Sequence, residues 1–167
     1  TASEIIKQLN SVRIGGFVSG IGSGGTLMGV SKRLKEVYPD ILIGAVEPEK
    51  MALLTSGKIL GNHKIEGIGD EFIPELVNRK IIDTVFDIND DDAINMSKLI
   101  NQKLGLGVGI SSGANFLGAV LLSEYTDMPI VTIFPDDNKK YLSTELVNNI
   151  NIKESFISNK IELIDYE

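Results

Sequence analysis

The sequence predicts an α/β domain in which a mostly parallel sheet is covered by helices on both faces, a three-layer αβα arrangement. One observation is a series of short apolar runs alternating with helical patterns, at residues 14–19, 41–47, 84–88, 107–110 and 129–134. Strands covered on both faces of a parallel sheet are continuous apolar runs. A second observation is a glycine-rich turn, SGIGSGGT, between the first run and a helical pattern. Strand, turn and helix in this succession are typical of the fold class.

The helical patterns between these runs have recognisable starts and ends. Apolar residues at i, i+3, i+7 and i+10 predict a helix over 27–37, which a Pro-Asp pair ends. Asn89, followed three residues later by an acid, is a typical helix start, and Gly105 is a typical residue after a helix end. We expect a third helix from about Ser112 and a short fourth helix over 140–147. The first residues, TASEII, are expected to begin a helix ahead of the first strand.

Composition limits the kinds of protein this chain can be. Its 167 residues are enough for one domain with a hydrophobic core, and 43% of them are hydrophobic. A formal net charge of −7 without a Lys/Arg cluster argues against nucleic acid and anionic membranes as partners. The absence of cysteine excludes thiolate metal sites and fits a cytoplasmic protein. From Asn148 the composition turns polar, so we expect a main domain over 1–147 and a tail over 148–167 that packs as an appendage or frays.

The glycine turn predicts an anion site. Gly20, Gly22 and Gly25 form a G-x-G-x-x-G pattern, and glycine lets a backbone approach a ligand closely. The N–H groups of the following helix start are then available to a phosphate. Glu47, at the end of the next strand, would suit a ribose hydroxyl, so a nicotinamide-dependent oxidoreductase is one alternative. A turn without a ligand is another. The Gly-Lys-Ser/Thr ending of a nucleoside triphosphate loop is missing.

A second motif, GISSG at 109–113, matches the G-x-S-x-G pattern of a hydrolase serine at Ser111. In that fold the acid and the histidine follow the serine along the chain. The single histidine here, His63, precedes Ser111, so chain order excludes the hydrolase interpretation. We expect His63 to be a loop residue rather than a catalyst.

Four segments in order resemble one known family. They are GIGSGGTLMGVSKRLKEVYPDILIGAVEP, HKIEGIGDEFIP, VGISSGANF and IFPDDNKKYLST. Together they resemble the cysteine synthases (O-acetylserine sulfhydrylases), which are fold-type II enzymes that use pyridoxal 5′-phosphate. The resemblance runs from about residue 1 to 147. The last segment departs from the family pattern because it lacks the glycine that usually precedes its Tyr-Leu-Ser-Thr ending, which concerns substrate detail.

The resemblance implies roles for individual residues. The cofactor phosphate would be held by Gly22, Ser23, Gly24, Gly25 and Thr26. Ser111 would hydrogen-bond the pyridine nitrogen, and a loop bordering the substrate would comprise Gly67, Ile68 and Gly69. The family's Schiff-base lysine lies in a segment before the glycine turn, and no lysine here sits in a matching motif. We therefore expect no catalytic residue in this chain, no metal, and no synthase activity from it as the C-terminal part of a longer enzyme.

For that longer enzyme, the resemblance implies cysteine synthesis by β-replacement of O-acetylserine with sulfide. A homodimer and the C-terminal tail of serine acetyltransferase are the implied partners. Within the same fold, cystathionine β-synthase and a phosphoserine-using synthase stay open, as does a non-catalytic partner-binding role. A chain without upstream sheet strands is also expected to leave strand edges open to self-association.

Overall fold

The main sheet of the computed structural model, which describes residues 1–164, is entirely parallel. Its strand order is β5-β2-β1-β6. The strands are β1 (Gly16–Gly20), β2 (Leu42–Pro48), β5 (Thr84–Ile88) and β6 (Ile130–Thr132). A short antiparallel hairpin, β3 (Met51–Ala52) with β4 (Lys58–Ile59), follows β2 and was not predicted.

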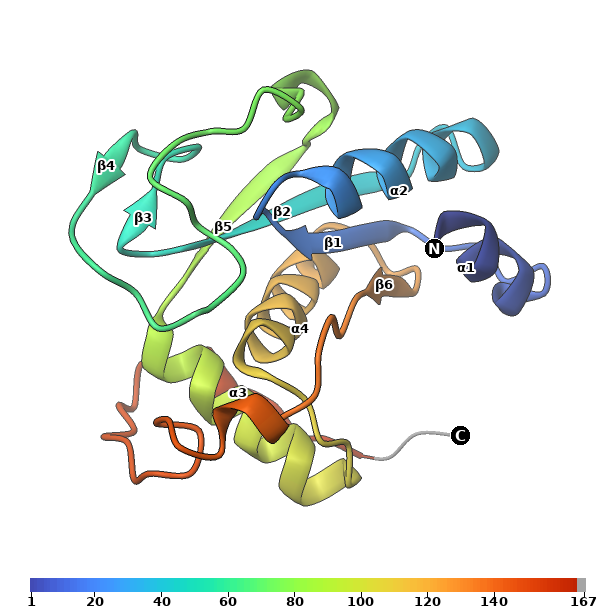
Figure 1. Cartoon of the computed structure of the whole chain (residues 1–167). Helices are drawn as coiled ribbons and strands as arrows, with labels where there is room; N and C mark the ends of the chain where they lie inside the picture. The colour runs from blue at the N-terminus through green and yellow to red at the C-terminus, as the bar shows by residue number, and fades with distance from the viewer. Residues whose placement is uncertain (165–167) are drawn as a thin grey trace.

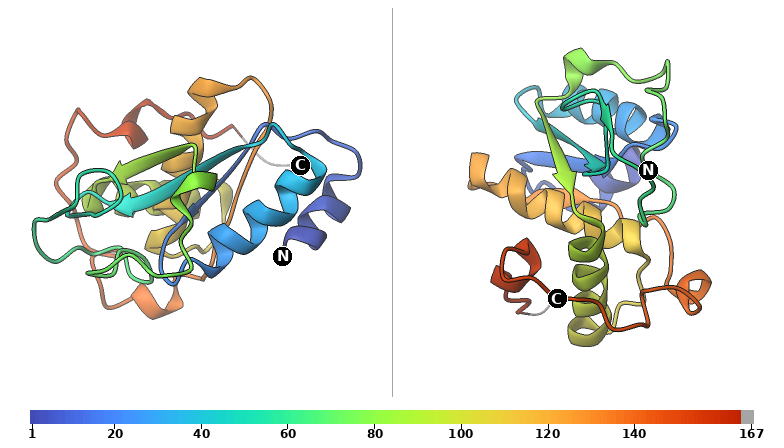
Figure 2. Two further views of the ribbon diagram at one scale, coloured as in Figure 1. Left: turned by 90° about the horizontal axis from the view of Figure 1, so that it is seen from above. Right: turned by 90° about the vertical axis from the view of Figure 1, so that its left-hand side faces the viewer.

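Helices cover both faces of this sheet, which confirms the predicted α/β layering. On one face lie α1 (Ala2–Leu9) and α2 (Gly25–Val37), above and to the right of the sheet in Figure 1. On the other face lies α4 (Ile110–Leu122), with α3 (Asp90–Leu104) packed against it. Figure 2 shows the same layers from two further directions.

Two hydrophobic cores result, one for each face of the sheet. Phe17 and Ile43 point toward α2, whereas Val18 and Val46 point toward α4. Successive residues of a strand face opposite sides, and all four of these side chains are fully buried. This double burial explains why the strands appear in the sequence as continuous apolar runs.

The predicted ends of α3 are confirmed in atomic detail. The Asn89 side chain accepts hydrogen bonds from the N–H groups of Asp91 and Asp92, at 3.0 and 3.4 Å. Gly105 adopts a left-handed conformation with φ of 68°, which glycine tolerates without a Cβ clash. Three acids in its first turn complete a start that favours negative charge.

Two predicted elements are wrong. Residues 107–110 do not form a strand: Val108 makes one isolated bridge to Asp137, and α4 already begins at Ile110. The Val108 N–H bonds to the Asn101 side chain at 2.7 Å instead of a neighbouring strand, so a short buried run here is a loop. The fourth helix, expected over 140–147, is a single 3₁₀ turn, η3 (Lys139–Tyr141), whose fully buried tyrosine anchors it.

The tail packs on α3 instead of fraying along its length. The Asp92 carboxylate accepts hydrogen bonds from the N–H groups of Ile157 and Ser158, at 2.7 and 3.1 Å. Asn95 donates to the Ser158 hydroxyl at 2.9 Å, and Phe156 is buried. These contacts fix the 3₁₀ helix η4 (Ile157–Lys160) beside α3 (Figure 2). The last three residues of the expected tail lie outside the described residues.

Candidate cofactor site

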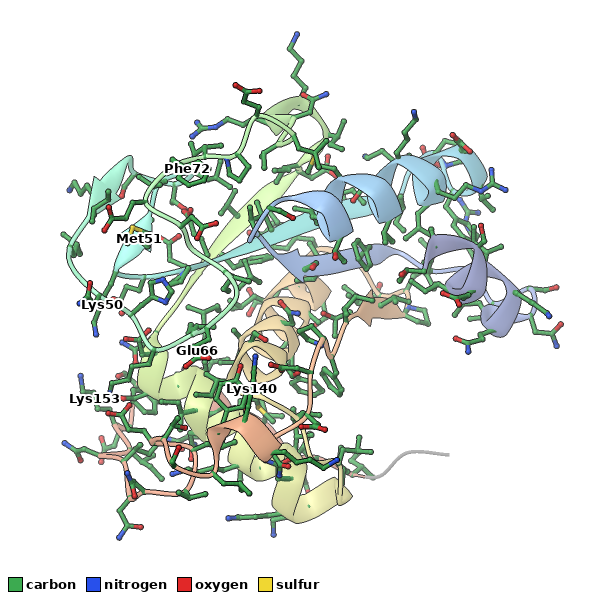
Figure 3. All side chains as sticks on the ribbon, viewed as in Figure 1. Lys50, Met51, Glu66, Phe72, Lys140 and Lys153 are labelled. Carbon is green, nitrogen blue, oxygen red and sulfur yellow. The ribbon has the colours of Figure 1, made fainter. Side chains whose placement is uncertain are left out.

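A cavity of about 310 Å³ lies at the carboxyl ends of β1 and β6. From β1 the chain passes to β2 on one side, and much later it reaches β6 on the other side. Parallel sheets bind ligands at such a topological switch point, because the loops that follow the two strands diverge there. The cavity is lined by Ser19, Gly20, Gly22, Ser23, Gly24, Gly25, Thr26, Glu66, Gly67, Ile68, Ser111, Asn115, Ile133, Pro135, Asp136 and Lys140. Glu66 and Lys140 are labelled in Figure 3.

The glycine turn supplies an anion-binding end to this cavity. Helix α2 begins at Gly25, after an N-cap glycine, Gly24, in a left-handed conformation with φ of 83°. The N-cap residue has no side chain to cap this helix start, and the first turn has no acid. The Gly25 N–H makes one long bond to the Ser23 hydroxyl, at 3.4 Å. The N–H groups that follow are available to an anion, and the positive end of the helix dipole favours one.

The loop over 67–69 closes against the glycine turn. A Cβ atom on Gly22 would lie 2.4 Å from the Gly67 carbonyl oxygen, so only glycine allows the two backbones to approach this closely. The Gly69 N–H donates to the Ile21 carbonyl oxygen at 2.9 Å. His63 Nε2 lies 2.9 Å from the Gly69 carbonyl oxygen and fixes the far end of the loop.

Ser111 also lines the cavity, from the first turn of α4. Its side chain is almost fully buried yet lines the cavity. The start of α4 at Gly109 is also without a side-chain cap or an acid in its first turn. The cavity lining therefore combines a helix start without an acid and a neutral hydroxyl, which suits a flat polar ring carrying a phosphate.

One carboxylate of the cavity wall, that of Asp136, is paired with two neighbouring side chains. Asp136 Oδ2 accepts hydrogen bonds from Lys140 Nζ at 2.6 Å and from the Tyr141 hydroxyl at 2.8 Å. The bond to Asp136 raises the pKa of the Lys140 ammonium, and burial raises the pKa of Tyr141 to about 12. Lys140 therefore carries a full positive charge at neutral pH.

The structure brings together most of the residues that the resemblance singles out. Of the nine cofactor and loop residues, only Gly69 lies outside the cavity lining, beside Pro48 and His63. Sequence reasoning missed Glu66, Asn115, Asp136 and Lys140. For Asn115 a signal was present, because it follows Ser111 by four residues and so shares its face of α4.

Glu47 does not serve the cavity. Its buried carboxylate accepts hydrogen bonds from the N–H groups of Leu54 and Thr55, at 2.9 and 2.8 Å, and from the Thr55 hydroxyl. These contacts tie down the turn after β3, and Glu47 is not among the residues that line the cavity. The ribose-binding role that would support a nicotinamide cofactor therefore has no structural support.

Comparison with known proteins agrees with this geometry. The family model for pyridoxal-phosphate dependent enzymes matches residues 1–136. The chain belongs to this family. The cofactor of this family is pyridoxal 5′-phosphate, as the resemblance implied.

Among relatives of this pyridoxal-phosphate dependent family, cysteine synthase B of Campylobacter jejuni is 44% identical over 147 residues, which are 87% of this chain and 48% of the relative. A hydrogen sulfide-producing enzyme of Fusobacterium nucleatum is 48% identical with a TM-score of 0.89, covering 95% of this chain and 48% of that one. An O-acetylserine dependent cystathionine β-synthase of Helicobacter pylori is 40% identical with a TM-score of 0.81, covering 87% and 47%. The chain spans about half the length of these relatives.

None of the helices within residues 1–164 is both long enough and apolar enough to cross a membrane. The same residues hold no group of three or more histidine, aspartate or glutamate side chains that could bind a metal ion.

Proposed function

We propose that the whole protein catalyses pyridoxal-phosphate dependent β-replacement, and specifically cysteine synthesis from O-acetylserine and sulfide. The observation that carries the proposal is the single cavity that unites the glycine turn with Ser111 at the switch point of the sheet. Bound pyridoxal 5′-phosphate supplies an electron sink for bond cleavage next to an amino group. The residues of this chain bind it and set the electronic state of its ring.

The phosphate end is assigned to the glycine turn. Backbone N–H groups of residues 22–26 and the hydroxyls of Ser23 and Thr26 would hold the phosphate at the start of α2. At neutral pH the phosphate is anionic, and the uncapped helix start offers partial positive charge without a side-chain counter-ion.

The ring nitrogen is assigned to the Ser111 hydroxyl. A neutral hydroxyl shares a hydrogen bond with the nitrogen but does not hold it protonated, as a free carboxylate would. The cavity's one aspartate, Asp136, already pairs with Lys140 and Tyr141. This pairing supports a weakly electron-withdrawing ring, which favours α,β-elimination and limits transamination.

Two charged side chains favour a second candidate, in which the nucleophile is an amino-acid thiol instead of sulfide. Glu66 and Lys140 line the same cavity with opposite charges. Glu66 would bind the ammonium of a zwitterion, and Lys140, whose ammonium also pairs with Asp136, would bind its carboxylate through another N–H, as the cystathionine β-synthase reaction would need. A phosphoserine donor is a further variant of the same chemistry.

Two partners are also proposed for the whole protein. One is a second copy, giving a homodimer. The other is the C-terminal tail of serine acetyltransferase, which would seat its terminal carboxylate in the cavity region and compete with substrate.

The test is an activity assay on the whole protein. We expect cysteine formation from O-acetylserine and sulfide, and expect Ser111→Ala to lower the rate by a modest factor of about tenfold. Formation of a thioether from O-acetylserine and homocysteine at a higher kcat/KM would favour the second candidate. Absence of both products, with cofactor bound, would contradict the β-replacement proposal.

A further inference from the structure

The ladder between β1 and β6 ends before β1 does. The two strands pair at Gly16–Ile130, Phe17–Val131 and Val18–Thr132, and no further. On its other side β1 continues to pair with β2 as far as Gly20. The strands therefore separate over the last two residues of β1, directly beneath the cavity.

A side-chain amide fills this separation. Asn115 Oδ1 accepts a hydrogen bond from the Gly20 N–H at 2.7 Å, and Asn115 Nδ2 donates to the Ile133 carbonyl oxygen at 2.8 Å. The orientation of the amide is fixed, because the backbone N–H can only donate and the carbonyl can only accept. Asn115 is 2% exposed, so neither backbone group has water as a ready substitute.

We infer that Asn115 is a positioning residue, a wedge that holds the ends of β1 and β6 apart and thereby opens the cofactor cavity. Its amide does for the two strands what a peptide group of an intervening strand would do. Gly20 leads directly into the glycine turn, and Ser111 lies one helical turn before Asn115 on the same face of α4. One side chain thus sets the spacing between the proposed phosphate end and the proposed ring end.

The consequence for cofactor binding rests on the proposed function of the cavity. Removing the amide leaves the Gly20 N–H and the Ile133 carbonyl unsatisfied, and the strands can then close on each other to recover the lost bonds. Closure narrows the space beneath the glycine turn. We expect weaker binding of the cofactor without unfolding of the chain.

The test uses this chain with pyridoxine 5′-phosphate as the probe. This compound keeps the ring and the phosphate but lacks the aldehyde, so it forms no adducts with surface lysines. Binding is measured by calorimetry for Asn115→Ala and for a matched control, Asn95→Ala, which removes a buried amide that bonds only to the tail. We expect Asn115→Ala to weaken binding by about tenfold or more, with Asn95→Ala unchanged.

A second variant separates positioning from a general loss of stability. In Asn115→Asp, an ionised carboxylate would still accept from Gly20 but would face the Ile133 carbonyl without a proton. Burial raises the pKa of such a carboxyl group, and once protonated it can again accept and donate as the amide does. We compare the affinity of Asn115→Asp with that of Asn115→Ala at the same pH. As the pH falls from about 8 to about 5, we expect the affinity of Asn115→Asp to rise toward that of the unmodified chain.

The outcomes distinguish this inference from the proposed function. If the unmodified chain does not bind the probe, the cofactor assignment is contradicted. The role of Asn115 as a wedge is then tested by hydrogen exchange and by the crystal structure of Asn115→Ala, which need no bound probe. We expect the Gly20 amide to lose protection from hydrogen exchange in Asn115→Ala, or the β1–β6 ladder to extend past Val18–Thr132 in its crystal structure. Unchanged exchange and spacing, or Asn115→Ala binding within about twofold of normal, would overturn the inference.

Discussion

At the scale of single residues, the cavity depends on a glycine, Gly24, where any side chain would be strained. Gly24 has a φ of 83°, and a Cβ atom there would lie 2.8 Å from Val77 Cγ2. Both the backbone conformation and the local space therefore exclude a side chain. Gly29, five residues further along α2, has open space around the position of a Cβ atom.

Gly24→Val should accordingly abolish cofactor binding, because the strained N-cap can no longer aim the first N–H groups of α2 at the phosphate. Gly29→Val is the matched control, with the same change on an exposed helix face. Titration with pyridoxine 5′-phosphate, together with circular dichroism to verify folding, compares the two. Normal affinity in a folded Gly24→Val protein would show that the phosphate binds elsewhere.

At the scale of elements, the ends of β2 and β5 are joined by an unusual carboxylate pair. The Thr55 hydroxyl lies 2.5 Å from both Glu47 Oε1 and Asp87 Oδ1. A hydroxyl has one proton, so it can donate to only one of these carboxylates. Burial, together with the nearby Glu47, raises the pKa of Asp87.

Asp87→Asn should therefore change how stability depends on pH. Because the folded-state pKa of Asp87 is raised, its favourable contribution is present below its unfolded-state pKa of about 4 and is lost as the pH rises through the folded value. The amide has no such titration. In urea titrations, we expect the free energy of unfolding of Asp87→Asn to increase relative to that of the unmodified chain as the pH rises from about 4 to about 7. A constant difference in the free energy of unfolding across that range would show that the pKa of Asp87 is not raised in the folded protein.

At the scale of the whole molecule, the sequence predicted the parallel sheet and the helices whose ends carry strong local signals. Asn89 and Gly105 are such signals, since capping is decided by residues within one turn. The strand expected over 107–110 failed because a short apolar run does not distinguish a strand from a buried loop.

The site was predictable only where contiguous motifs carry it. The glycine turn and Ser111 lie in such motifs. The spacing from Ser111 places Asn115 on the same face of α4. Its bonds to Gly20 and Ile133, and the place of Asp136 in the cavity wall, depend on how β1, α4 and β6 meet, which no local pattern records. The tail likewise docks through the Asp92 carboxylate, a contact between residues far apart in the chain.

A crystal structure of this chain with pyridoxine 5′-phosphate would show whether one cavity holds both the phosphate and the ring of the cofactor. We predict the phosphate on the N–H groups of residues 22–26 and the ring nitrogen within hydrogen-bond distance of the Ser111 hydroxyl. A phosphate bound away from the start of α2, or a ring nitrogen turned from Ser111 toward Asp136, would contradict it.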